Sequence, residues 1–301
     1  MTSPIARLPR NSLLTLLTLM VIHFAEAQTN QPAASTGFEF LPEGLDFAPL
    51  KANAQEARVG VLKYFSTSNL KVDIGNTIDV FGWRNSNDAM RFTLGIDFMA
   101  YAFVTGSQGL RLQVDAIDGF FGGHLSATKY LEDSRLQARL RILHLSAHML
   151  DGHYELATKR WIDDREPIPF TKDFGELVVA HDVNPDFGVF KYYGGISYAT
   201  LGRPTQIERF GFLAGFELGT VDIIGSVLDK PTIPFVAVHA TLSGNPVYTG
   251  NINTQVGVKF GDWDRKGIVL YLAYYNGNNF FSEYFDQRVT IWGTGFTVDF
   301  P

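Results

Sequence analysis

A strict alternation of apolar and polar residues is the feature that most constrains the fold of this chain. It is clearest in residues 91–98 and recurs in residues 111–116, 210–218 and 252–260. Successive side chains of a β-strand point to opposite faces, so this period of two predicts strands with one apolar face. In residues 91–98 that face carries Phe92, Leu94, Ile96 and Phe98.

The opposite face of these strands mixes Arg, Asp, Gln, Glu and Gly, which can interlock inside a narrow lumen. Strands in lipid must close on themselves because no backbone edge can stay unpaired there. The sequence therefore predicts an all-β fold, a transmembrane outer-membrane β-barrel of about twelve antiparallel strands with a filled or narrow lumen. The strands are expected near residues 58–66, 71–83, 90–103, 109–121, 135–148, 175–183, 187–200, 208–219, 233–243, 251–262, 267–276 and 287–300.

The composition agrees with this class. The chain has 25 Phe, 12 Tyr and 29 Gly and no cysteine, and its net charge is −6. High aromatic and glycine content with few charges suits a barrel in lipid, although a secreted β-sandwich could show it too. The negative charge argues against nucleic acid as a partner.

The N-terminus has the pattern of an export signal. Arg7 and Arg10 precede an apolar run at residues 13–24, and Ala25-Glu26-Ala27 supplies a small-x-small cleavage site. An uncleaved anchor is the alternative, but the run is shorter than the roughly 20 residues of a spanning helix. We expect a signal peptide at residues 1–27, a linker and irregular segment at 28–56 and the barrel at 57–301, in the outer membrane of a Gram-negative bacterium.

The last strand places Trp292, Phe296, Val298 and Phe300 on one face. An aromatic residue near the end of the final strand resembles the assembly signal of outer-membrane proteins, which implies the barrel-assembly machinery as a partner. Pro301 departs from that pattern because it makes the aromatic residue penultimate.

The fifth expected strand carries the candidate site. Its odd positions include Arg135, Arg139 and Arg141, and His144, Ser146 and His148 continue its even face. If the arginines point into the lumen, unbroken alternation turns the histidines and the serine outward, towards outer-membrane lipid at the extracellular rim. A β-bulge would reverse this. We expect the arginines to pair with lumen carboxylates such as Asp97, Asp115 and Glu217, and an anion path is the alternative.

A serine becomes a nucleophile when a neighbouring imidazole removes its proton, and a carboxylate or amide then orients the imidazole. The first function hypothesis is therefore a serine-type lipid-ester hydrolase. Its candidate catalytic residues are Ser146, His144, His148 and Asp151. Glu155, Asp163 and Asp164 are further candidates for the orienting group.

Other uses of the same residues stay open. His144 and His148 lie about 13 Å apart on a strand, too far to share one zinc ion. His148 could bind a metal with Asp151 and His153, and the acidic loop could hold calcium. These side chains could also be polar residues at head-group depth without chemistry. The second function hypothesis is a non-enzymatic structural barrel or a narrow solute pore.

Two segments resemble a known family. The segment LPEGLDFAPLKANAQEARVGV, residues 41–61, is similar to the opening of an uncharacterised bacterial envelope family known only as a domain of unknown function. The segment HLSAHMLDGHYE, residues 144–155, resembles that family's element His-x-Ser-Ser-His-Leu-Gly-Asp-Glu, which His144, Ser146, His148 and Asp151 match. This resemblance implies an exported β protein and no particular activity.

A narrower resemblance is to the outer-membrane phospholipase A family. It implies a twelve-stranded barrel with a His-x-Ser pair facing lipid, an amide partner on the next strand, and calcium. Only His144 and Ser146 carry over, since Asn184 lies at the other end of the next expected strand. A homodimer would be one way to complete such a site.

Overall fold

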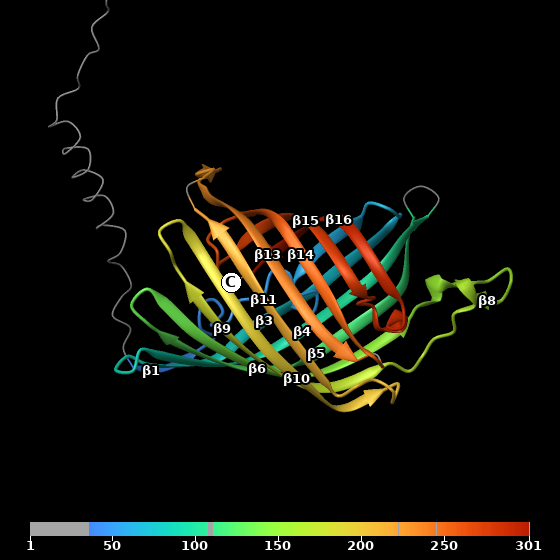
Figure 1. Cartoon of the computed structure of the whole chain (residues 1–301), viewed down its shortest axis with the longest axis horizontal. Coiled ribbons are helices and arrows are strands. Elements are labelled where there is room, and N and C mark those ends of the chain that lie inside the picture. Colours follow the sequence, from blue (N-terminus) through green and yellow to red (C-terminus); the bar gives the residue numbers. More distant parts are fainter. Residues whose placement is uncertain (1–35, 108–110, 222, 245, 301) are drawn as a thin grey trace, which may run out of the picture.

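The computed structural model describes residues 36–107, 111–221, 223–244 and 246–300, and within them the chain forms a closed antiparallel barrel (Figure 1). Each long strand pairs with its neighbour along the chain, and the barrel closes where β16 pairs with β2. The prediction of about twelve antiparallel strands is confirmed. The wall consists of β2 (Val59–Tyr64), β3 (Asn69–Asn85), β4 (Met90–Ser107), β5 (Arg111–Tyr130), β6 (Ser134–Met149), β9 (Thr171–Val183), β10 (Gly188–Arg203), β11 (Phe210–Thr220), β13 (Lys230–Gly244), β14 (Tyr248–Phe260), β15 (Gly267–Asn278) and β16 (Arg288–Asp299).

The barrel has two different ends. At one end β2 begins and β16 finishes, and we call this the terminal end. At the opposite end, the far end, the longest connection (residues 150–170) carries the hairpin β7 (Tyr154–Glu155) and β8 (Arg160–Trp161), which projects at the right of Figure 1. Short 3₁₀ turns also lie in the far-end connections: η1 (Asp151–His153), η2 (Ile162–Asp164) and η3 (Ser282–Tyr284).

The connection between β11 and β13 carries a short hairpin. It contains β12 (Ser226–Val227), which pairs with the start of β13. Leu228 and Asp229, between the paired residues, have φ of 50° and 59°. Positive φ at both central residues is the geometry of a tight hairpin turn, which a helix cannot contain.

The outer surface of the wall is an apolar belt. Large aliphatic and aromatic side chains point outward from the middle of the strands, among them Ile78, Leu94, Ile96, Phe121, Leu125, Leu140, Val179, Ile196, Val256, Leu270 and Phe296. Aromatic pairs lie towards both ends, with Trp83 and Phe92 at the terminal end and Tyr198 and Phe210 at the far end. This surface is compatible with an outer-membrane barrel. The described residues contain no helix long and apolar enough to cross a membrane.

The interior is filled by the segment that precedes the wall. Residues 37–40 form β1 (Gly37–Phe40), which pairs with the end of β3. Residues 41–58 then run irregularly through the lumen, where Phe47, Leu50 and Ala52 are buried (Figure 1). We call residues 41–58 the plug. Its first turn requires Gly44, whose φ of +78° favours glycine. The predicted signal peptide at residues 1–27 lies outside the described residues.

Candidate functional site

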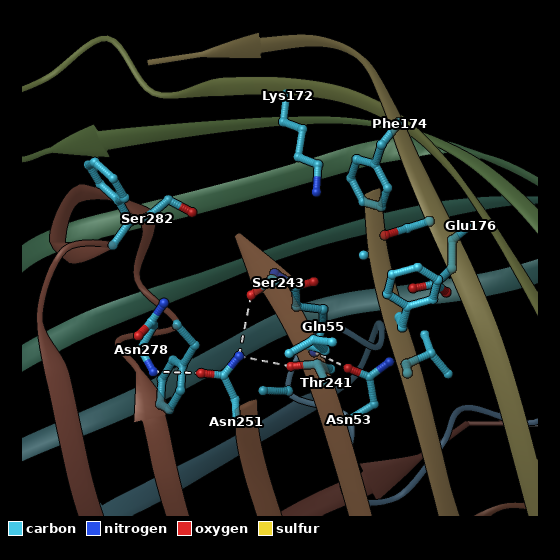
Figure 2. Close-up of a pocket in the computed structure, with 18 of the residues that line it drawn as sticks. Asn53, Gln55, Lys172, Phe174, Glu176, Thr241, Ser243, Asn251, Asn278 and Ser282 are labelled. Carbon is cyan, nitrogen blue, oxygen red and sulfur yellow. Dashed lines mark hydrogen bonds between the residues drawn. The ribbon is translucent and has the colours of Figure 1, made fainter. Parts of the chain in front are cut away.

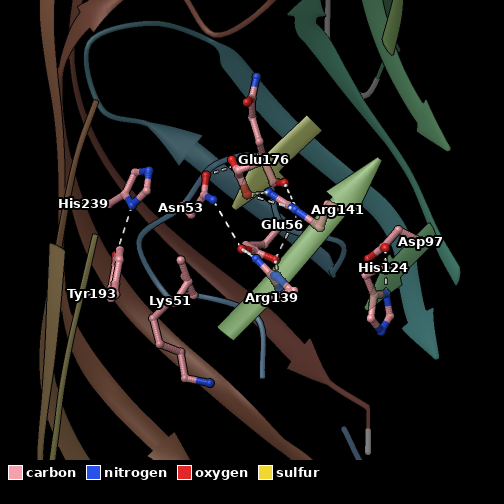
Figure 3. A network of polar contacts seen from close by, with 12 residues as sticks. Lys51, Asn53, Glu56, Asp97, His124, Arg139, Arg141, Glu176, Tyr193 and His239 are labelled. Carbon is pink, nitrogen blue, oxygen red and sulfur yellow. Dashed lines mark hydrogen bonds and ion pairs between the residues drawn. The ribbon is translucent and has the colours of Figure 1, made fainter. Parts of the chain in front are cut away.

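The plug is bound to the barrel wall by buried ions. Both carboxylate oxygens of Glu56 accept bonds from Arg139 of β6, at 3.0 and 2.5 Å, and Arg141 lies 3.4 Å from the same carboxylate (Figure 3). Arg141 also donates two bonds to Glu176 of β9. Burial opposes the ionisation of Glu56, but the two guanidinium groups outweigh it and lower its pKa to about 2. Glu56 is therefore a carboxylate inside the lumen at neutral pH.

Further contacts hold the plug along its length. The amide of Lys51 donates to Glu217 at 2.6 Å, and Asn253 donates to the carbonyl of Ala52 at 2.6 Å. Near the start of the plug, Asp46 accepts a bond from Thr128, while its Oδ1 is buried without a hydrogen bond among the described residues. Burial is the main cause that raises the pKa of Asp46 to about 6. The lumen is filled by an integral part of the fold.

The arginines of β6 pair with carboxylates, but the partners differ from those expected. Arg135 pairs with Asp182 and Asp264, and Arg139 and Arg141 take Glu56 and Glu176. The expected partners bind elsewhere. Asp97 contacts His124, Asp115 accepts from Thr105, and Glu217 accepts from Lys51. Glu56 was missed because it precedes the first strand and gives no periodic signal.

The candidate catalytic strand has no bulge. β6 keeps an unbroken register with both β5 and β9. Leu143, Leu145 and Ala147 continue the inward face of the arginines and are buried in the core at the far end. His144, Ser146 and His148 therefore point outward from the barrel near its far end, as unbroken alternation predicts.

The imidazole of His144 contacts Asp173 of β9. Oδ1 of Asp173 lies 2.5 Å from Nδ1 of His144, and the two residues are direct neighbours across the β6–β9 pair. Both side chains are partly exposed, at 35% for His144 and 43% for Asp173. The sequence interpretation missed Asp173 because it placed this residue in the loop before an expected strand at 175–183. The strand in fact begins at Thr171.

Open space lies beside Ser146. Its neighbour on β5 is Gly119, and a side chain at that position would meet only the carbonyl of Ser146, at 4.0 Å. Its neighbour on β9 is Thr171, whose hydroxyl donates a hydrogen bond to the carbonyl of Leu145. A large group can therefore approach the Ser146 hydroxyl from outside the barrel.

The other sequence candidates lie apart from this contact. His148 is exposed two residues beyond Ser146, and Asp151 opens the turn η1 at the far end. Glu155 accepts a bond from Thr158, Asp164 lies near Arg160, and His153 turns inward to Asp115. Among the described residues there is no group of His, Cys, Asp and Glu that could hold a metal ion.

Comparison with known proteins places the chain in a family whose activity is unknown. The sequence model of the family described as "Protein of unknown function (DUF1207)" matches residues 29–300. The chain belongs to this family. The match confirms the resemblance to an uncharacterised family, and it includes both the plug and the wall. No curated protein and no solved structure matches the chain, so the phospholipase resemblance stays a prediction.

Proposed function

We propose that this DUF1207 member is an outer-membrane lipid-ester hydrolase, with Ser146 as nucleophile, His144 as general base and Asp173 as the group that orients His144. The observation that carries the proposal is the 2.5 Å contact between His144 and Asp173 on the outer face, beside Ser146. A carboxylate on Nδ1 leaves Nε2 as the proton acceptor, which is the state of the imidazole that can activate a serine hydroxyl.

The position of these residues selects the substrate. The outward face of β6 below them carries Leu140 and Ile142, which belong to the apolar belt. The terminal end of an outer-membrane barrel faces the periplasm, so the far end reaches the outer leaflet. There the ester groups of a lipid would lie at the height of Ser146, and a polar cluster on a lipid-facing wall is costly unless it has such a use.

The chemistry follows from these three groups. His144 Nε2 takes the hydroxyl proton as Ser146 Oγ attacks the ester carbonyl, and Asp173 stabilises the imidazolium that forms. The carbon–oxygen bond to the alcohol then breaks, and the alcohol leaves with that proton. Water, deprotonated by His144, hydrolyses the acyl-serine and releases the fatty acid.

The filled lumen argues against the alternative of a solute pore, because the plug crosses the interior and is bound by buried ion pairs. Asp173 comes from the same chain, so a second copy is not needed to orient His144. Homodimer formation, a calcium requirement and roles for His148 and Asp151 stay predictions.

The test is turnover of a phospholipid ester in mixed micelles by the refolded protein, with calcium and with a chelator, beside Ser146→Ala. Ser134→Ala is the matched control, since Ser134 begins the same strand at the terminal end. We expect turnover, and covalent labelling by a fluorophosphonate, in the wild type and in Ser134→Ala but not in Ser146→Ala. Turnover that survives in Ser146→Ala would exclude Ser146 as the nucleophile, and no turnover in a folded wild type would leave a non-enzymatic barrel.

A further inference from the structure

A second site lies inside the barrel. Between the plug and the far-end loops there is a cavity of about 180 Å³ (Figure 2). Plug residues 52–55 line it on one side, and the end of β15 with the loop after it (residues 278–285) lines another. The strands β9, β10, β11, β13 and β14 supply the walls. The volume is below the roughly 300–1,000 Å³ of drug-sized sites, so it suits one small ring rather than a chain.

Lys172 supplies a cation to the cavity, whose lining also includes the carboxylates of Glu176 and Glu208. Its side chain points into the cavity in Figure 2, where the ammonium lies 4.7 Å from the ring centre of Phe174. Among the described residues it forms no hydrogen bond or ion pair. The nearest acid on its own face, Glu176, already accepts two bonds from Arg141. A half-buried ammonium without a bonded anion is a ready partner for an acidic ligand.

Polar groups that could bind the hydroxyl groups of a ligand lie on the other walls of the cavity. The side-chain amide of Asn278 and the hydroxyl of Ser197 line the cavity and form no hydrogen bond with described residues. Asn251 is held in place by bonds to Thr241, Ser243 and the backbone of Asn278, as the dashed lines in Figure 2 show. A cavity wall with fixed amides and free donors fits a ligand with several hydroxyl groups.

Aromatic rings complete the lining. Phe174, Tyr275, Phe280 and Phe285 border the cavity. Such rings bury the C–H face of a small polar ring, while the few polar groups fix its orientation. The cavity thus combines the ammonium of Lys172, the carboxylates of Glu176 and Glu208, amide and hydroxyl partners for a ligand's hydroxyl groups, and flat apolar surfaces.

We propose that this cavity binds a single-ring acidic sugar, with its carboxylate on Lys172 and its hydroxyls on Asn278 and Ser197. The site is separate from Ser146 and does not depend on the hydrolase proposal. The cavity lies inside the barrel between the plug and the far-end loops, so the ligand is a soluble sugar acid rather than a lipid.

Calorimetric titration of the refolded full chain tests the proposal, with glucuronate as the probe and glucose and inorganic phosphate as comparison ligands. We expect glucuronate to bind and both comparison ligands to bind at least about tenfold more weakly, because each lacks one half of the recognition. Lys172→Met should weaken glucuronate binding by at least about tenfold. Lys129→Met, an exposed lysine near the terminal end of β5, should not.

A second variant separates binding from folding. Ser197 faces Gly211 across the β10–β11 pair, and both residues line the cavity. Ser197→Phe should fill the cavity and abolish binding while the barrel keeps its strand content by circular dichroism. The proposal is wrong if glucose binds as tightly as glucuronate, if phosphate alone does so, if folded wild type binds none of them, or if folded Lys172→Met keeps its affinity.

Discussion

Glu56 of the plug and Arg139 of β6 form a two-point ion pair that joins the irregular N-terminal segment to the wall of the barrel. Both side chains are almost completely buried, and Arg141 shares the same carboxylate. The pair connects residues far apart in the sequence, so the plug is part of the folded unit.

Glu56→Gln should destabilise this unit. The amide removes the negative charge and leaves two buried guanidinium groups with Glu176 alone, a loss of about 3–5 kcal/mol for a broken buried pair. Unfolding in denaturant, followed by circular dichroism in detergent, measures the change. Glu43→Gln is the matched control, because Glu43 is exposed in the same segment. Equal midpoints for the two variants would contradict the assignment.

Asp46→Asn should stabilise the folded barrel, and only at higher pH. The folded-state pKa of Asp46 is about 6, against an ordinary value of 3.8. Folding therefore favours the protonated form, and the associated stability is present below pH 3.8 and lost as the pH rises through 6. The variant should be more stable than the wild type by about 1–3 kcal/mol near pH 8 and equal to it near pH 3. A stability difference that does not change with pH would refute this.

Asp173→Asn tests the orientation of His144. An amide can hold the ring but does not stabilise the imidazolium, so ester turnover should fall by roughly 10²–10⁴-fold while the barrel stays folded. The measurement is the initial rate in mixed micelles. Asp164→Asn, on the exposed loop, should keep the wild-type rate. If both variants behave alike, Asp173 does not act through His144.

Ile96→Arg tests whether the apolar belt faces lipid. Ile96 lies in the middle of β4 with 57% of its surface exposed. A lipid-facing arginine at mid-depth costs about 2–4 kcal/mol, so the variant should fold less stably into lipid vesicles. Leu156→Arg is the control, because Leu156 is exposed in the far-end loop rather than on the belt. Equal stability of the two variants would place the belt outside a bilayer.

The wild type should conduct almost no ions across a planar bilayer, whereas deletion of residues 41–56 should produce steady single-channel currents. The plug crosses the lumen and supplies Glu56, without which Arg139 and Arg141 would line an open path. Wild-type currents equal to those of the deletion variant would show that the plug leaves the lumen open.

The sequence predicts the wall of the barrel well because every strand there separates an apolar face from a polar one. The alternation that places Ile96 outside and Asp97 inside needs no knowledge of partners. The outward direction of His144 and Ser146 follows from the same rule. Strand ends are less well predicted, and the start of β9 at Thr171 rather than near residue 175 hid Asp173.

The plug could not be predicted, since residues 41–58 follow no period and their polar groups read as a solvated linker. Glu56 is buried because Arg139 and Arg141 of β6 surround it, a contact between distant segments that spacing does not encode. The cavity beside the plug depends on loops that fold back into the mouth. Ser282 is held there by Asp118, at 2.5 Å.

Strand β9 supports both proposed sites with consecutive residues. Lys172 and Phe174 line the inner cavity, and Asp173 between them contacts His144 outside. The register of the β9–β10 pair shifts at Thr200, which is an extra residue in β10, so β9 itself runs without interruption. A single-residue insertion or deletion within the first residues of β9 would turn the inward-facing side chains outward and the outward-facing ones inward, and would therefore disrupt both sites. The long loop before Thr171 is free to vary in length. The alternation of inward and outward side chains along β9, in contrast, is constrained by both sites together.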